Sequence, residues 1–258
     1  LFWLAGGLAV YWIARDLTGP PGGLLALGFF LFAPYGIAAS RSFQPDPLMT
    51  ALTLFAWFCM LRWARACGWK WVLAAGLLSG AAMMVKALAV FTVLGGMAGA
   101  FLYRALARPD APAVEGVEGQ SDTGSAHYKL ASTANASAIR AVLRDPQFWV
   151  MGLVAAAPVL AWTIAGFSSG GTLGSQFALR FFPSLWLDPL FYLRWERMVE
   201  RVAGLLPFIL ALVGWFTFRG RQMRAFALGL WSGYILFGFV FAYYFITHNY
   251  YHIALVPI

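Results

Sequence analysis

The sequence predicts an all-α fold, a polytopic transmembrane helical bundle. Of the 258 residues, 61% are hydrophobic and 11% are charged, and the mean hydropathy is +0.72. Soluble domains average about 45–50% apolar and about 25% charged residues. Long apolar runs separated by polar segments favour helices over the alternating pattern of a membrane β-barrel. We therefore expect about eight to nine spans in one transmembrane domain covering residues 1–258.

The apolar runs define the expected spans in chain order. The first, residues 1–14, is short, and because the chain begins inside it we interpret the sequence as a fragment of a longer protein. Lys86 divides one apolar stretch in two, since the whole stretch is too long for one helix and a lysine favours a turn. The remaining spans are predicted at 23–40, 47–62, 70–85, 87–103, 147–166, 204–218 and 225–246, with a last one beginning near residue 252.

The basic residues orient these spans. If the loop at 15–22 lies in the cytoplasm and the spans alternate, lysines and arginines fall about two to one on the inner loops, as the positive-inside rule requires. The net charge of +8 is therefore assigned to membrane topology and not to nucleic-acid binding. We expect an integral protein of a bacterial inner membrane.

Two long loops interrupt the spans. Residues 104–146 are rich in Ala, Gly, Ser and acidic residues, which predicts a flexible cytoplasmic linker. Residues 167–203 carry aromatic, aliphatic and arginine residues at helical spacing, which predicts one or two amphipathic helices on the outer membrane surface. Asp188 and Pro189 suit the N-cap and first position of the second helix. Three small-residue pairs favour close helix contacts: Gly76/Gly80, Gly95/Gly99 and Gly229/Gly233.

The segment Ser40–Met49 places an arginine, an aspartate and two prolines between two spans. Such residues are costly beside hydrocarbon, so the segment is either an interfacial loop or part of a polar site. Asp46 suits an N-cap of the span at 47–62. It also suits a site carboxylate that orients a hydroxyl, takes part in proton transfer or binds a divalent cation. Arg41 is a second candidate, as a ligand of substrate.

The predicted topology puts three further polar groups on the same outer face. Lys86 is either a snorkelling lysine at a helix end or a point charge for a phosphate. The arginines of the outer loop, Arg180 and Arg194 among them, are further candidate ligands of substrate. The turn His248–His252 is either an aromatic interfacial belt or a wall of the site, with His248, Asn249, Tyr250 and Tyr251 as substrate contacts. Asp46, His248 and His252 are candidate ligands of a metal ion.

Three stretches resemble GT-C glycosyltransferases of the protein-mannosyltransferase and aminoarabinose-transferase type. Phe43–Met49 is similar to their second external loop, and Trp71–Lys86 to a helix that ends in a lysine. His248–Pro257 is similar to a Tyr…Leu-Pro turn into a late span. Members of this family transfer a sugar from a polyprenyl-phosphate carrier to a protein, lipid or glycan acceptor on the periplasmic or lumenal face.

The resemblance implies roles for particular residues. Asp46 matches the acidic residue of the second external loop, Lys86 a residue near the donor phosphate, and residues 167–203 a mobile outer element over the entrance. The main catalytic carboxylate of the family lies in a first external loop that would precede Leu1, so we expect the fragment to be inactive. The alternative is a transporter or flippase that binds a lipid-linked or anionic substrate without chemistry, which charges inside spans and broken helices would favour.

Overall fold

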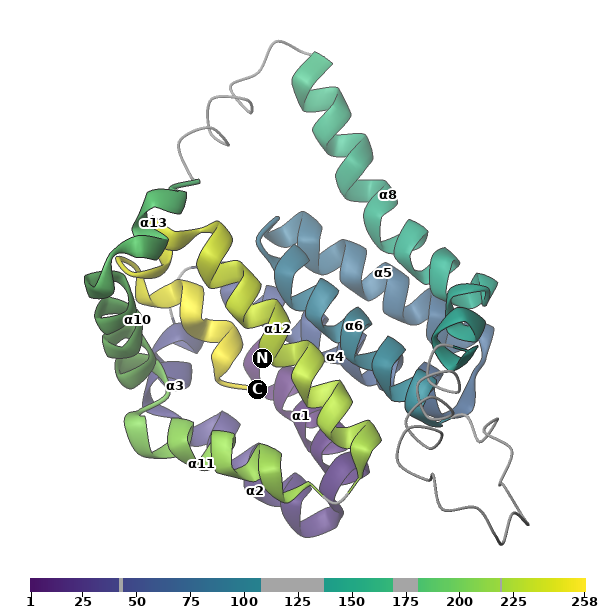
Figure 1. The fold of residues 1–258 in the computed structure, drawn as a ribbon, viewed down its shortest axis with the longest axis horizontal. Helices are drawn as coiled ribbons and strands as arrows, with labels where there is room; N and C mark the ends of the chain where they lie inside the picture. Colours follow the sequence, from purple (N-terminus) through teal and green to yellow (C-terminus); the bar gives the residue numbers. More distant parts are fainter. Residues whose placement is uncertain (42–43, 108–136, 169–180, 219) are drawn as a thin grey trace, which may run out of the picture.

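The computed structural model describes residues 1–41, 44–107, 137–168, 181–218 and 220–258 (Figure 1). Within these ranges every regular element is a helix and none is a strand. The predicted all-α class is thereby confirmed. The elements are α1 (Phe2–Thr18), α2 (Pro20–Phe32), α3 (Pro34–Arg41), α4 (Asp46–Ala66), α5 (Trp69–Val85), α6 (Ala89–Ala107), a short helix at 137–143, α8 (Pro146–Ser168), η1 (Pro183–Leu187), α10 (Pro189–Val202), α11 (Leu205–Thr217), α12 (Arg221–Val240), α13 (Ala242–Phe245) and η2 (Asn249–Leu255).

Four of the described helices are long and apolar enough to cross a membrane, namely α4, α6, α8 and α12. The total becomes six if two bent pairs, α2 with α3 and α10 with α11, each count as one span. This is fewer than the eight to nine predicted. One reason is length, because α5 has 17 residues and extends only about 26 Å against a hydrocarbon thickness of about 30 Å.

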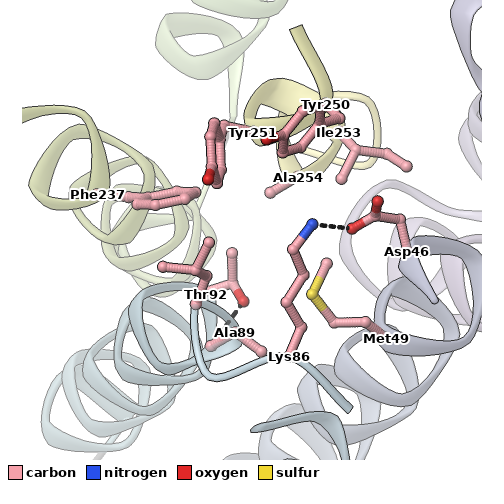
Figure 2. Close-up of a pocket in the computed structure, with 11 residues that line it drawn as sticks. Asp46, Met49, Lys86, Ala89, Thr92, Phe237, Tyr250, Tyr251, Ile253 and Ala254 are labelled. Carbon is pink, nitrogen blue, oxygen red and sulfur yellow. Dashed lines mark hydrogen bonds and ion pairs between the residues drawn. The ribbon is translucent and has the colours of Figure 1, made fainter. Parts of the chain in front are cut away.

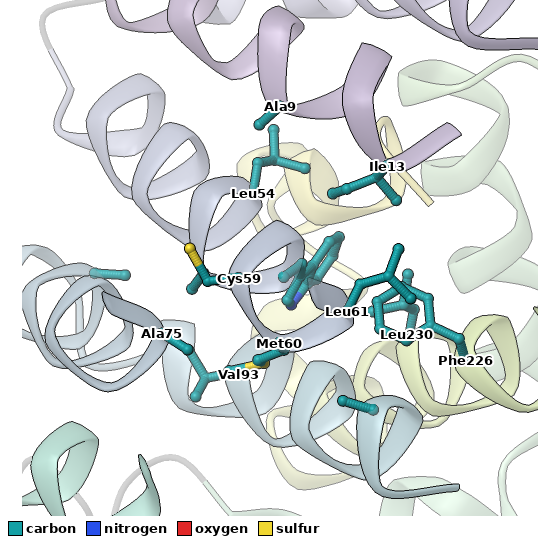
Figure 3. Close-up of a cluster of buried hydrophobic side chains, with 14 of the residues drawn as sticks. Ala9, Ile13, Leu54, Cys59, Met60, Leu61, Ala75, Val93, Phe226 and Leu230 are labelled. Atoms are coloured by element: carbon teal, nitrogen blue, oxygen red, sulfur yellow. The ribbon is translucent and has the colours of Figure 1, made fainter. Parts of the chain in front are cut away.

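Helix α4 lies at the centre of the bundle and packs against α1, α5 and α6. Helix α12 packs on α6, α8 on α5, and α2 on α1 (Figure 1). Apolar side chains of α4, including Leu54 and Leu61, lie among residues of α1, α5, α6 and α12 in the buried cluster (Figure 3). The core is therefore built around the helix that begins with Asp46.

Two glycine pairs bring α6 and α12 into backbone contact. A Cβ added at Gly95 would lie 2.8 Å from the carbonyl oxygen of Gly229, and one at Gly99 would lie 2.5 Å from that of Phe226. Only glycine permits this approach, which provides the close helix packing that drives association in membranes. The third pair behaves likewise, because a Cβ at Gly80 would lie 3.1 Å from the Ala155 oxygen of α8. All three predicted contacts are confirmed.

The two ends of the bundle carry different polar groups. At the C-terminal end of α4, Arg62 and Arg65 contact the carboxylate of Asp16 at 3.3 and 3.0 Å. Nearby, Arg104 of α6 contacts Asp145 at 2.5 Å. Asp46 begins α4, about 24 Å from Arg62 along the helix. The structure therefore separates Arg62, Arg65 and Arg104, which the predicted topology puts on the inner side, from the predicted site.

Candidate functional site

Asp46 and Lys86 meet at one end of the bundle. The Nζ atom of Lys86 lies 2.6 Å from Oδ1 of Asp46, and Figure 2 shows the lysine pointing across the pocket toward the carboxylate. Lys86 follows the last residue of α5, where an extended conformation ends the helix and turns the chain into α6. The predicted placement of this lysine at a turn is confirmed.

Asp46 does not act as an N-cap, which corrects one of its two interpretations. Pro45 occupies the cap position, no side chain bonds there, and Asp46 is already the first residue of α4. A carboxylate in the first helical turn still gains from the helix dipole. Because its side chain extends toward Lys86, its role is an ion pair between α4 and the end of α5.

The pair is unequally buried. The side chain of Asp46 is 3% exposed, whereas that of Lys86 is 22% exposed. Among the described residues, Oδ2 of Asp46 has no hydrogen-bond partner. One carboxylate oxygen is therefore neutralised while the other remains available as an acceptor, and the ammonium keeps a face open to an incoming anion.

Two tyrosine rings of η2 contact the ammonium group of Lys86. Nζ of Lys86 lies 4.8 Å from the ring centre of Tyr250 and 5.6 Å from that of Tyr251. Cations over aromatic faces gain about 0.5–2 kcal/mol, depending on desolvation. Figure 2 shows both tyrosines on the side of Lys86 that faces η2. The rings fix the position of the ammonium without neutralising its charge.

A small cavity of about 20 Å³ lies beside the ion pair. That volume holds about one water molecule. Its walls come from α4, the α5–α6 turn with the first residues of α6, α12 and η2, so four segments distant in sequence build it. The lining residues are Asp46, Met49, Lys86, Leu88, Ala89, Thr92, Phe237, Tyr250, Tyr251, Ile253 and Ala254.

The other predicted ligands lie outside this cavity. Arg41 is exposed at the end of α3, and Arg194 is exposed on α10. Asn249 is exposed at the start of η2. His248 borders the site, with its ring 5.3 Å from that of Tyr250. Arg180 falls outside the described residues.

The two histidines of the turn do not face a common metal position. His252 is fully buried, with Nε2 2.7 Å from the carbonyl oxygen of Phe245 and Nδ1 2.7 Å from the hydroxyl of Tyr234. Because a carbonyl only accepts, Nε2 donates and Nδ1 accepts from Tyr234. Burial lowers the pKa of His252 to about 4, although the bond to Phe245 acts in the opposite direction. No cluster of three or more His, Cys, Asp or Glu side chains occurs in the described part of the chain.

A hydrogen-bond chain behind the site was not predicted from the sequence. The indole of Trp195 on α10 donates to the hydroxyl of Tyr234 on α12 at 3.1 Å, and that hydroxyl donates to His252. The chain ties α10, α12 and η2 together and so supports Tyr250 and Tyr251. In the sequence this hydrogen-bond chain is visible only as one aromatic residue with a polar ring atom or hydroxyl in each of the three helices, and that pattern is too common to be specific.

The described fold and site define a polytopic helical membrane protein with a buried acid–base ion pair at one end of its bundle. The family model for dolichyl-phosphate-mannose-protein mannosyltransferase matches residues 1–109, a range that contains both Asp46 and Lys86. This match supports the resemblance to membrane glycosyltransferases of the GT-C type over that part of the chain. No curated protein and no solved structure matches the chain.

Proposed function

We propose that the protein transfers a glycosyl group from a polyprenyl-phosphate sugar to a protein, lipid or glycan acceptor, on the periplasmic face of a bacterial inner membrane. The observation that carries this proposal is the partly exposed ammonium of Lys86, which Asp46 and the rings of Tyr250 and Tyr251 hold in place. Asp46 and Lys86 both lie within the region that the family model matches.

The proposed reaction is an inverting displacement. The acceptor oxygen forms a bond to the anomeric carbon, the bond from that carbon to the phosphate oxygen breaks, and its electron pair stays on the departing phosphate. Lys86 stabilises the negative charge that develops on this phosphate. The acceptor proton passes to a carboxylate base.

Asp46 orients the acceptor in this scheme. Its Oδ1 is held by Lys86, while Oδ2, without a partner among the described residues, accepts a hydrogen bond from the acceptor hydroxyl. Since the cavity holds about one water molecule, the donor phosphate meets Lys86 at its exposed face. A divalent cation beside Asp46 remains a candidate cofactor.

The test is a transfer assay on the full-length protein in proteoliposomes, with a radiolabelled polyprenyl-phosphate sugar. We expect Asp46→Asn and Lys86→Ala each to reduce turnover at least a hundredfold, while Arg41→Gln, outside the cavity, keeps most of it. Near-normal turnover in both site variants would refute the assignment. Expression and gel-filtration profiles establish that the variants are folded.

One observation favours transport as a second candidate. The helices α2 and α3 are bent by 56° at their junction, and α10 and α11 by 98°, and broken helices are frequent at transporter binding sites. Asp46 and Lys86 nevertheless lie at helix ends. A flipping assay with a fluorescent polyprenyl phosphate separates the two functions, because transport without glycosyl transfer would favour the second.

A further inference from the structure

Helix α10 has one face fixed on the bundle. Phe191, Val199 and Val202 are buried there, and Trp195 bonds to Tyr234. The indole of Trp195 also occupies the space that a side chain at Gly238 of α12 would need. This docking defines which residues of α10 face outward.

The outward flank carries a row of three arginines. Arg194, Arg197 and Arg201 are spaced i, i+3 and i+7, so they lie along one side of the helix. All three are exposed, and within the described ranges none forms an ion pair. Glu196 and Glu200 are also exposed, but their positions put them on the other flank. The two signs of charge are therefore separated around the helix.

Apolar residues accompany the arginines. Leu190 and Leu193 are 52% and 55% exposed, and with Arg194 and Arg197 they continue the i, i+3, i+4, i+7 pattern of one side. Leu187, at the end of η1, is 90% exposed. Leucines beside arginines on an exposed flank are typical of helices at a membrane interface, where the leucines enter the acyl boundary and the guanidinium groups remain at the headgroups.

The next helix sets the orientation of α10. Helix α11 is apolar and has no buried residue, so its exposed sides suit a hydrocarbon environment. The axes of α10 and α11 differ by 98°. The 13 residues of α11 reach only part of the way across the bilayer. If they enter the hydrocarbon with the usual tilt of about 20° from the membrane normal, α10 runs within roughly 30° of the membrane plane.

We propose that the row Arg194–Arg197–Arg201 binds the phosphate groups of anionic phospholipids at the membrane surface, with Leu190 and Leu193 inserted beside them. Guanidinium groups form paired hydrogen bonds with phosphate oxygens. The row is separate from the proposed donor site, since none of its arginines lines the cavity at Lys86. This contact anchors α10, and through Trp195 it supports the tyrosines over Lys86.

The test measures lipid binding to the full-length protein in detergent by native mass spectrometry. Phosphatidylglycerol and phosphatidylcholine with identical acyl chains are added at equal concentration. We expect preferential phosphatidylglycerol binding by the wild type. Binding should fall about fivefold for each arginine changed to glutamine, and about 100-fold in R194Q/R197Q/R201Q. Phosphatidylcholine binding should not change.

Matched variants separate this row from other sources of affinity. E196Q/E200Q changes the opposite flank and should retain phosphatidylglycerol binding, and R194K/R197K/R201K should recover most of it. The double variant Asp46→Asn/Lys86→Met, which removes the charge of the donor site without leaving an unpaired carboxylate, should bind the lipid normally, and this distinguishes the two sites. Unchanged phosphatidylglycerol binding in the triple glutamine variant would overturn the proposal. Displacement by an equal concentration of inorganic phosphate would overturn it too, because it would indicate a site for free anions.

Discussion

The ammonium of Lys86 lies 4.8 Å from the centre of the Tyr250 ring, although 164 residues separate them in sequence. The contact joins the α5–α6 turn to η2 across the cavity. The neutral tyrosine ring positions the charged ammonium, so an arriving phosphate does not have to displace the tyrosine.

Replacing Tyr250 tests this contact. Tyr250→Leu removes the aromatic face, and with it about 0.5–2 kcal/mol of attraction for the ammonium. We expect the turnover of the proposed transfer to fall about 3- to 30-fold. Tyr250→Phe keeps the face and should retain turnover within about twofold. Equal losses in the two variants would show that the hydroxyl, and not the ring, is what matters.

The ion pair itself should respond unequally to loss of either partner. Lys86→Ala leaves the nearly buried Asp46 without its counter-charge, which costs about 3–5 kcal/mol of unfolding free energy. Asp46→Asn leaves the charge on the more exposed partner and should cost less. Asp46→Asn combined with Lys86→Met should be more stable than Lys86→Ala alone. Thermal unfolding in detergent measures this order, and a reversed order of the single variants would contradict the burial argument.

The glycine contacts between α6 and α12 should tolerate no methyl group. Gly99→Ala places its Cβ 2.5 Å from the carbonyl oxygen of Phe226, and backbone cannot move aside as a flexible side chain does. We expect a loss of about 1–3 kcal/mol and a lower melting temperature. Gly28→Ala in α2 is the control, because a Cβ there meets nothing within 4 Å. That variant should be neutral or slightly stabilising.

His252 should make stability depend on pH below about 6.5. Its pKa is about 4 in the folded protein against 6.5 for a free histidine, so between these values only the unfolded chain takes up the proton. Stability is therefore lost as pH falls from 6.5 to 4, by about 3 kcal/mol in total. Melting temperatures recorded across this range should show the decline. The decline should persist in His248→Gln and flatten in His252→Gln.

The positions of most helices could be predicted because length and apolarity are local properties. The predicted runs 70–85 and 147–166 correspond to α5 and α8 within a few residues. Two breaks were missed. The run 23–40 is divided at Ala33, just before Pro34, since proline disfavours helical geometry in the residue preceding it. The run 225–246 is divided at Phe241 between α12 and α13.

The sequence predicted which residues form the site better than it predicted the contacts between them. The order of spans placed Asp46, Lys86 and the turn at 248–252 on one face, and the structure brings Asp46, Lys86, Tyr250 and Tyr251 together. Neither the ion pair nor the role of His252 could be predicted, because each depends on packing between segments far apart in the chain. A capping pattern at Asp46 was misleading for the same reason, as the partner of the carboxylate lies 40 residues away.

The glycine contacts between α6 and α12 also determine the distance between Lys86 and Tyr250 in the site. Lys86 lies three residues before α6, and η2 follows α12 after the short α13, so the register of these two helices sets the height of Tyr250 above the ammonium. A slip of one residue along α12 would move its end by about 1.5 Å. Substitutions at the α6–α12 contact can therefore alter the distance between the Tyr250 ring and the Lys86 ammonium, although they replace no residue of the site.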